Sequence, residues 1–330
     1  MEQRLTISPS PHIHSGDSIS RNMYDVLIAL IPAFVVMLYQ YRLQALSLTA
    51  IAVVACLLTE WIITKFLMKR PLHLWDGSAI LTGVLLAFNL PASLPWWLVI
   101  LGSVVAIGIG KMAFGGLGNN VFNPALVGRV FLLISYPAAM TTWSSQPAMG
   151  VDGMTGATPL GVMKQILGGS GASYDAYNSW SFALGMDNGS MGETSAIALL
   201  IGLVYLLIRK VITWHTPVSI IATVLVFGQI MNWVDPSLYP SGLFHLATGG
   251  LMLGAVFMAT DYVTSPITGR GQLIYGFFIG LLTVIIRLWG AYPEGMSFAI
   301  LIMNAFTPLI NTYMLPHHFG HIKARKEVKK

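Results

Sequence analysis

A short segment that begins at Asp152 and reads Asp-Gly-Met-Thr-Gly-Ala-Thr-Pro-Leu could present a hydroxyl group to a large ligand. Gly153 and Gly156 allow a tight turn with exposed backbone N–H groups, because glycine adopts backbone angles that other residues avoid. Two hydroxyls, on Thr155 and Thr158, flank the turn, and the carboxylate of Asp152 can accept hydrogen bonds or attract a cation. The same residues also suit an ordinary surface turn, so spacing alone leaves both interpretations open.

The composition around this segment indicates a membrane protein. Of the 330 residues, 55% are hydrophobic and only 9% are charged, whereas a soluble domain carries about 25% charged residues. The net charge of +5 comes from basic residues scattered at the ends of apolar segments. This distribution is typical of membrane orientation signals rather than of phosphate binding. We therefore expect contact with membrane lipid and no nucleic-acid partner.

The chain has one cysteine, Cys56, which lies in an apolar run. One cysteine cannot form an internal disulfide, and iron–sulfur clusters and structural zinc need about four ligands. We expect no metal site, and we assign no residue a catalytic role. The polar residues 1–20 contain no apolar core behind a charged start, so we do not expect a signal peptide.

Ten apolar segments could cross the bilayer, for which a helix needs about 20 residues. The expected spans cover residues 24–40, 46–68, 77–90, 95–113, 122–136, 194–212, 217–233, 245–260, 272–289 and 297–315. Between the fifth and sixth spans lies a loop of about 55 residues, 137–192, and loops of this length are usually functional or disordered. Within the loop we expect helical turns only around residues 160–167.

Basic residues predict the orientation of these spans. In a ten-span chain most of them fall on one side, which the positive-inside rule makes cytoplasmic; they are Lys65, Lys69, Arg70, Lys111, Arg209, Lys210, Arg270 and the tail. The loop 137–192 has a single basic residue, Lys164, and lies on the other side. Both termini are therefore expected in the cytoplasm, with Thr158 facing the periplasm.

The long loop divides the spans into two sets of five, and an odd number per set makes the second set inverted. The third span of each half is short and interrupted by glycine, at Thr82-Gly83 and at Thr248-Gly249-Gly250. Paired broken segments of this kind point to a site near the membrane midplane. Irregular backbone at that depth must line a cavity or be covered by protein. We therefore expect a polar cleft between the halves.

Asp-Gly-x-Thr/Ser-Gly-Ala-Thr-x-Leu resembles the flavinylation motif of the Rnf complex D subunit and of the B subunit of the sodium-pumping NADH:quinone reductase. Two further segments are similar to this family, Phe122-Asn123-Pro124-Ala125 with Gly128-Arg129, and Met258-Ala259-Thr260-Asp261 with Thr264-Ser265-Pro266. The resemblance covers the whole chain. It implies FMN joined to Thr158 by a phosphoester bond, with Asp152, Gly153, Thr155, Gly156 and Ala157 as the rest of the motif.

The family's fold implies an all-α membrane protein of about ten transmembrane helices. They form two inverted five-helix repeats with broken third helices, resembling urea channels, plus a long periplasmic loop. The segments would be a cytoplasmic N-terminal segment (1–20), the first repeat (21–136), a flavin-bearing loop (137–192), the second repeat (193–316) and a basic cytoplasmic tail (317–330). A bacterial inner membrane is implied by the same resemblance.

The resemblance also implies a second flavin. In the quinone-reductase relatives a non-covalent riboflavin binds toward the cytoplasmic side, between the repeats. By resemblance, Asn123, Thr260, Asp261 and the loop Gly115-Gly116 could contact such a flavin. From the residues alone, Asp261 could equally cap a turn, while an intramembrane carboxylate is by default a candidate functional group.

Other charged residues keep several interpretations. Arg129, about two turns into the fifth span, must face protein or water; it could contact a flavin phosphate, pair with a carboxylate or bond to carbonyls of another helix. Lys111 and Arg287 lie near span ends, where long basic side chains can snorkel to the interface. Glu60 is a candidate cation or proton ligand, as are Asp25 and Asp76, although the nearby Lys65 allows a plain ion pair.

The favoured function is the membrane component of a redox-driven, ion-translocating complex of the Rnf type, a ferredoxin:NAD oxidoreductase. In this interpretation the chain carries electrons through covalent FMN, its partners are the A, B, C, E and G subunits, and a flavin transferase matures it. One alternative is a B-type subunit of a sodium-pumping NADH:quinone reductase. Another is a non-redox channel or transporter of the urea-channel kind, which has no need for the motif around Thr158.

Overall fold

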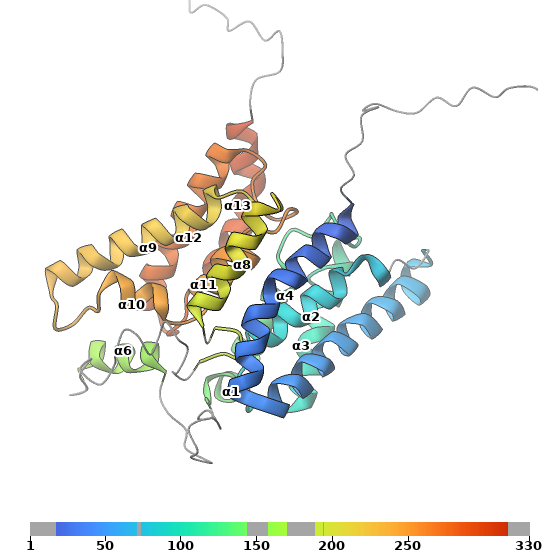
Figure 1. The fold of residues 1–330 in the computed structure, drawn as a ribbon, viewed down its shortest axis with the longest axis horizontal. Coiled ribbons are helices and arrows are strands. Elements are labelled where there is room, and N and C mark those ends of the chain that lie inside the picture. The colour runs from blue at the N-terminus through green and yellow to red at the C-terminus, as the bar shows by residue number, and fades with distance from the viewer. Residues whose placement is uncertain (1–17, 71–73, 144–157, 170–188, 194, 316–330) are drawn as a thin grey trace, which may run out of the picture.

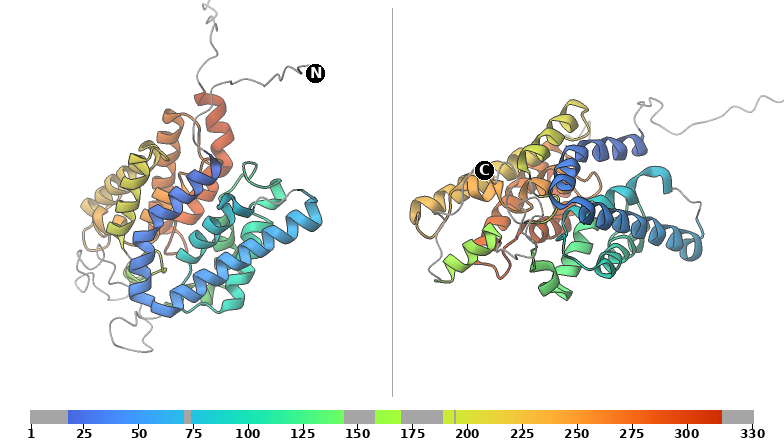
Figure 2. Two further views of the ribbon diagram at one scale, coloured as in Figure 1. Left: turned by 45° about the vertical axis from the view of Figure 1, so that its right-hand side comes forward. Right: turned by 60° about the horizontal axis from the view of Figure 1, so that its bottom comes forward.

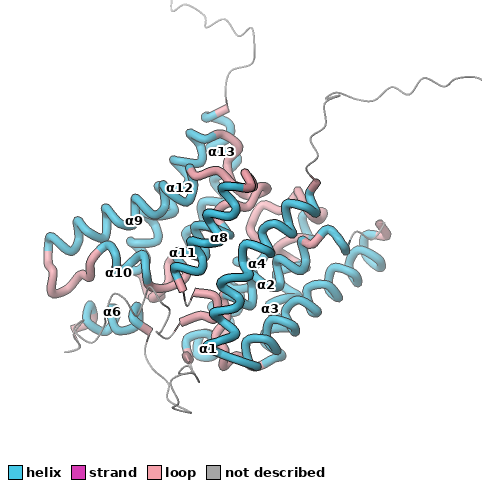
Figure 3. The backbone as a smooth tube through the Cα atoms, viewed as in Figure 1, coloured by secondary structure: helices cyan, strands magenta, loops and turns pink. Residues whose placement is uncertain are grey.

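A computed structural model of the chain describes residues 18–70, 74–143, 158–169, 189–193 and 195–315. All regular structure within these ranges is helical, as Figure 3 shows, which confirms the all-α prediction. The elements before residue 170 are α1 (Ile19–Ile62), η1 (Ile63–Met68), η2 (Leu74–Asp76), α2 (Ser78–Phe88), α3 (Trp96–Gly108), η3 (Met112–Phe114), α4 (Pro124–Ser135), α5 (Pro137–Thr141) and α6 (Pro159–Leu167). Those after it are α8 (Ala196–Ile208), α9 (His215–Val234), α10 (Gly242–Ala247), α11 (Leu251–Leu253), η6 (Gly254–Met258), α12 (Gly269–Trp289) and α13 (Met296–Met314).

Hydropathy and length show which helices suit a membrane. Among the described residues, five helical stretches are long and apolar enough to cross one; they are Ile19–Met68, Trp96–Phe114, His215–Val234, Gly269–Trp289 and Met296–Met314. The apolar helices α2, α4 and α8 are shorter. These helices make the chain an integral membrane protein, and the count of ten spans stays a prediction.

The chain reverses direction within α1. Ser18 caps its start by accepting a hydrogen bond from the backbone N–H of Arg21. At Arg42 the backbone leaves the helical region, with φ at 50° and ψ at −129°. Figure 2 shows the two limbs of α1 on either side of this bend. The limbs match the two separate helices expected at residues 24–40 and 46–68.

Two groups of helices pack side by side (Figure 1). In the first group α1 packs against α2 and α3, and α3 against α4; in the second, α9 packs against α10 and α12, and α12 against α13. The groups meet where α8 contacts α1 and where α13 contacts α4. The described chain begins and ends at the upper end in Figure 1, whereas α6 lies at the lower end and packs against α12.

The predicted break in the third segment is confirmed in the second half and contradicted in the first. In the second half, helix α10 ends at Ala247 and the helix resumes at Leu251, so the predicted break at Thr248–Gly250 is confirmed. In the first half the predicted break at Thr82-Gly83 is wrong, because α2 is continuous through both residues. A Cβ on Gly83 would lie 2.7 Å from the Cα of Val53 in α1. Gly83 therefore lets two helices approach closely, as small residues do in membranes.

Gly83→Ala should separate α1 from α2 and destabilise the protein by about 1–3 kcal/mol, the usual cost of overpacking. Gly108→Ala is the matched control, because a Cβ there would meet only Ile63, at an ordinary 3.7 Å. Thermal unfolding in detergent measures both. Equal melting temperatures for the two variants would contradict the close approach at Gly83.

Candidate functional site

Thr158 is the N-cap of helix α6. Its Oγ1 accepts a hydrogen bond from the backbone N–H of Gly161 at 3.1 Å, and its carbonyl oxygen accepts one from Val162 at 2.9 Å. Pro159 occupies the first helical position, where a missing N–H costs nothing. The side chain of Thr158 is partly exposed. The remaining motif residues, Asp152, Gly153, Thr155, Gly156 and Ala157, lie outside the described residues.

This position favours an anionic substituent on the Thr158 hydroxyl. The first turn of a helix has backbone N–H groups without partners inside the helix, and the helix dipole places partial positive charge there. Such a turn is a general binding site for phosphate. A phosphoester on Oγ1 of Thr158 would place its oxygens at the N-terminus of α6. The geometry at Thr158 therefore fits the phosphate of FMN.

Contacts with the second half hold α6 in place. Leu160 and Met163 are buried, and the ammonium of Lys164 donates hydrogen bonds to the carbonyl oxygens of Gly290 at 2.5 Å and Leu288 at 3.4 Å. These carbonyls belong to the C-terminal end of α12, which carries partial negative charge. Partial burial lowers the pKa of the Lys164 ammonium. The helix capped by Thr158 is thus anchored to α12.

Charged side chains lie at the break between α10 and α11. Arg287 of α12 is fully buried and donates hydrogen bonds to the carbonyl oxygens of His245, at 2.6 Å, and Thr248, at 2.9 Å. On the other side of the break, Glu193 approaches so closely that a Cβ on Gly250 would lie 2.3 Å from its Oε1. The end of α10 therefore meets a cation, and the start of α11 meets a carboxylate. This is the arrangement that helix dipoles favour.

Arg129 of α4 reaches the same region. Its side chain is 5% exposed, and it forms ion pairs with Glu193, at 3.4 Å, and with Glu294, and a hydrogen bond with the side-chain oxygen of Asn89. Of the interpretations open for Arg129, pairing with a carboxylate is the one the structure shows. Neither glutamate was a candidate from sequence. Both lie just before helices, where an acidic residue is normally an exposed capping residue.

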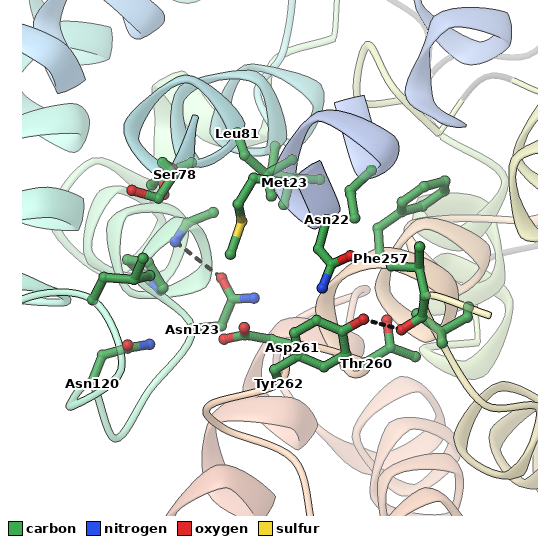
Figure 4. A pocket seen from close by; sticks show the side chains of 18 of the residues that line it. Asn22, Met23, Ser78, Leu81, Asn120, Asn123, Phe257, Thr260, Asp261 and Tyr262 are labelled. Carbon is green, nitrogen blue, oxygen red and sulfur yellow. Dashed lines mark hydrogen bonds between the residues drawn. The ribbon is translucent and has the colours of Figure 1, made fainter. Parts of the chain in front are cut away.

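A pocket opens between the halves near the start of α1 (Figure 4). Its enclosed volume is about 80 Å³. Small-molecule sites usually have about 300–1,000 Å³, so a larger ligand would extend out of the pocket through its mouth. Three of the residues predicted to contact a second flavin line it: Asn123, Thr260 and Asp261. Gly115 and Gly116 instead line a neighbouring pocket, and Arg129 lines neither of the two. The structure therefore brings together only some of the residues predicted to contact a second flavin.

Polar contacts hold the pocket wall, and one of them joins the halves. Asn123 caps α4 through its side-chain oxygen, and its amide donates to the carbonyl oxygen of Met258 at 3.2 Å. Thr260 donates to the carbonyl oxygen of Val256 at 2.6 Å. Asp261 accepts a hydrogen bond from the Thr264 hydroxyl at 3.2 Å, and burial raises the pKa of its carboxyl.

Lys111 also lines this pocket, and sequence reasoning did not place it there. Its ammonium donates to both oxygens of Glu60, at 2.7 and 2.8 Å, and to the Ser78 hydroxyl at 2.7 Å. Lys111 and Arg287 are 2% and 0% exposed, so the expectation that they snorkel is wrong. Glu60 pairs with Lys111, whereas Lys65 lies over the ring of Trp61, 4.9 Å from its centroid.

Known proteins are similar to this chain over nearly its whole length. The model of the NQR2, RnfD, RnfE family matches residues 6–320. The chain is 45% identical to the D subunit of the Na(+)-translocating ferredoxin:NAD(+) oxidoreductase complex of Acetobacterium woodii, over 99% of each chain. It is 44% identical to the D subunit of the proton-translocating ferredoxin:NAD(+) oxidoreductase complex of Clostridium ljungdahlii, over 96% of each chain. It is 41% identical to the D subunit of the ion-translocating oxidoreductase complex of Stutzerimonas stutzeri, over 92% of each.

Lys111→Met should destabilise the protein by about 3–5 kcal/mol, because it leaves the Glu60 carboxylate buried without a partner. The double variant Lys111→Met/Glu60→Met should recover most of that loss, since it removes both charges and fills the space with apolar groups. Thermal unfolding in detergent compares the three proteins. A double variant no more stable than Lys111→Met would show that the pair is not coupled.

Proposed function

Because the chain belongs to the NQR2, RnfD, RnfE family, we propose that it is the D subunit of an ion-translocating ferredoxin:NAD(+) oxidoreductase complex and carries electrons through FMN bound to Thr158. The observation that carries this proposal is the 44–45% identity to two such subunits over at least 96% of each chain. A match of this extent leaves no part of the chain for an unrelated domain. The B-type quinone-reductase subunit is disfavoured, because both of these relatives are named as D subunits of ferredoxin:NAD(+) oxidoreductase complexes.

The position of Thr158 supports the covalent attachment. FMN supplies one- and two-electron transfer through its flavin ring. Oγ1 of Thr158 would form the phosphoester, the N-terminus of α6 would stabilise its charge, and Lys164 would fix α6 against α12. A covalent link keeps the cofactor in place without the binding free energy that a free ligand needs.

The packing supports two repeats, and five spans in each would make the second inverted. In the first half, α1 packs against α2 and α3, and α3 against α4; the corresponding pairs in the second half are α9 with α10 and α12, and α12 with α13. The equivalent elements occur in the same chain order. We include in the proposal ten spans, a urea-channel-like fold, both termini in the cytoplasm and α6 at the periplasmic face of a bacterial inner membrane. In Figure 1, α6 lies at one end of the molecule and the two ends of the described chain lie at the other, which supports placing them on opposite sides of the membrane.

The pocket lined by Asn123, Thr260 and Asp261 is our proposed site for a second, non-covalent flavin, riboflavin. It lies between the two halves, at the end where the described part of α1 begins. Amide, hydroxyl and carboxyl groups could bond to the polar edge of a flavin ring, and the apolar residues Leu81 and Val256 would face its rings. The proposed partners remain the A, B, C, E and G subunits, with a flavin transferase for maturation.

Replacing Thr158 tests the covalent link. Thr158→Asn should abolish the added FMN mass while keeping the N-cap of α6, because asparagine caps helices at least as well as threonine. Thr158→Ser, the matched control, keeps both the cap and the hydroxyl and should retain FMN. Intact-protein mass spectrometry of the chain from a host with the transferase measures all three proteins.

Two other outcomes of the mass measurement would contradict the proposal. An added flavin mass that persists in Thr158→Asn would place the ester elsewhere. A wild-type chain with no added mass would refute the electron-carrier role and favour the channel or transporter.

The orientation can be tested by cysteine labelling, since the native Cys56 is fully buried. Gln165→Cys in α6 and Arg270→Cys at the start of α12 both place a thiol at an exposed position. A membrane-impermeant maleimide added to intact spheroplasts should label the first and spare the second until the membrane is opened. Labelling with the reverse preference would invert the proposed topology.

A further inference from the structure

Arg129, Glu193, Glu294 and Asn89 form a buried group that we call the Arg129 cluster. Its side chains come from α4, the segment before α8, the connection between α12 and α13, and the C-terminal end of α2. It adjoins the break between α10 and α11, because a Cβ on Gly250 would meet both Glu193 and Arg129. The proposed function assigns no role to this cluster.

One carboxylate oxygen of the cluster lacks a hydrogen-bond donor among the described residues. The Glu193 side chain is 3% exposed, and its Oε2 has no partner. Leaving a buried carboxylate oxygen without a donor is costly, so the cluster is short of one donor and indicates an additional ligand. A guanidinium between two carboxylates repels a metal cation, whereas a proton on one carboxyl supplies an O–H donor. The chemistry therefore favours a proton as that ligand.

Glu294 is the member that solvent can reach. Its side chain is 16% exposed, compared with 3% for Glu193. Glu294 also lies close to the helix that Thr158 caps, because a Cβ on Gly249 would meet both Leu160 of α6 and Oε1 of Glu294. Leu160 is two residues from Thr158. A charge added at Thr158 would thus act on Glu294 over a short path through protein.

We propose that Glu193 and Glu294, bridged by Arg129, form a proton-binding site, and that Glu294 takes up one proton when negative charge is added to the group on Thr158. The inference rests on the proposed function. The electron comes from the ferredoxin side of the complex, and the proton comes from water. An O–H bond forms on Glu294 and supplies the donor that the cluster lacks. The ion pair with Arg129 becomes a hydrogen bond between a guanidinium and a neutral carboxyl, and the added positive charge offsets the electron.

The other charged and titratable groups around Glu294 are less suited to this role. Arg287 of α12 is fully buried and bonded to two carbonyl oxygens. Lys164 of α6 is bonded to the carbonyl end of α12. His245 of α10 has two ring nitrogens without partners among the described residues. It is 0% exposed, and the guanidinium of Arg287 beside it disfavours a second positive charge. Arg129 keeps its proton at all relevant pH values, and Glu193, at 3% exposed, is less accessible to solvent than Glu294.

The test uses the purified complex and the midpoint potential of the Thr158 flavin as a function of pH. The absorbance change of the Thr158 flavin is obtained by subtracting the spectrum of a complex that carries Thr158→Asn from that of the complex with Thr158. The wild-type potential should fall as pH rises, because reduction takes up protons on the flavin ring and one more on Glu294. Glu294→Gln should make this dependence shallower, and Glu294→Asp should restore the wild-type slope. Asp235→Asn, which removes a carboxylate between α9 and α10, should leave it unchanged.

Infrared difference spectra of the wild-type complex provide a readout that does not depend on a variant folding. Reduction should produce a band of a protonated carboxyl that shifts in D₂O, and Glu294→Gln should lack it. An unchanged pH dependence and an unchanged band in Glu294→Gln overturn the proton site while FMN on Thr158 stands. Absence of FMN from the wild-type chain overturns the function and this inference together.

Discussion

The break between α10 and α11 is the constraint on which the rest of the structure depends. Lipid cannot satisfy free backbone groups, so an interrupted helix survives in a membrane only where protein supplies partners. Arg287 supplies donors to the carbonyls of His245 and Thr248, and the carboxylate of Glu193 lies against Gly250. Once two opposite charges are buried for this purpose, they require counter-charges of their own. Arg129 provides one for Glu193, and its ion pairs with Glu193 and Glu294 join the halves.

The same constraint determines what lies next to α6. Glycine at the break leaves no side chain there, so Leu160 of α6 can approach Gly249 directly. Lys164 then reaches the carbonyl end of α12. The helix capped by Thr158 is therefore anchored on the one part of the second half where buried charge is concentrated among the described residues. A covalently held redox group placed there would be sensitive to the charge state of the residues below it.

Hydropathy predicted the helices well, because burial in lipid acts on each segment independently of its neighbours. The helical turns expected around residues 160–167 correspond to α6, but the N-cap role of Thr158 was not predicted, although Thr-Pro is a local signal for a helix start. Contacts between distant segments were not predictable. Arg129 pairs with residues 64 and 165 positions away, and spacing contains no signal for such distances. Gly83 was misread for a related reason, since a glycine that breaks a helix and one that packs it look identical in sequence.

The contacts of the unbroken α2 connect the pocket to the Arg129 cluster. At the end of the unbroken α2 lies Asn89, whose amide donates to the sulfur of Met258 and whose oxygen accepts from Arg129. Asn123, at the pocket wall, donates to the carbonyl oxygen of the same methionine. The pocket at one end and the Arg129 cluster at the other thus share a connecting residue at the interface of the halves. A shift of η6 that moves Met258 would alter both sites at once, which is the physical requirement for coupling between them.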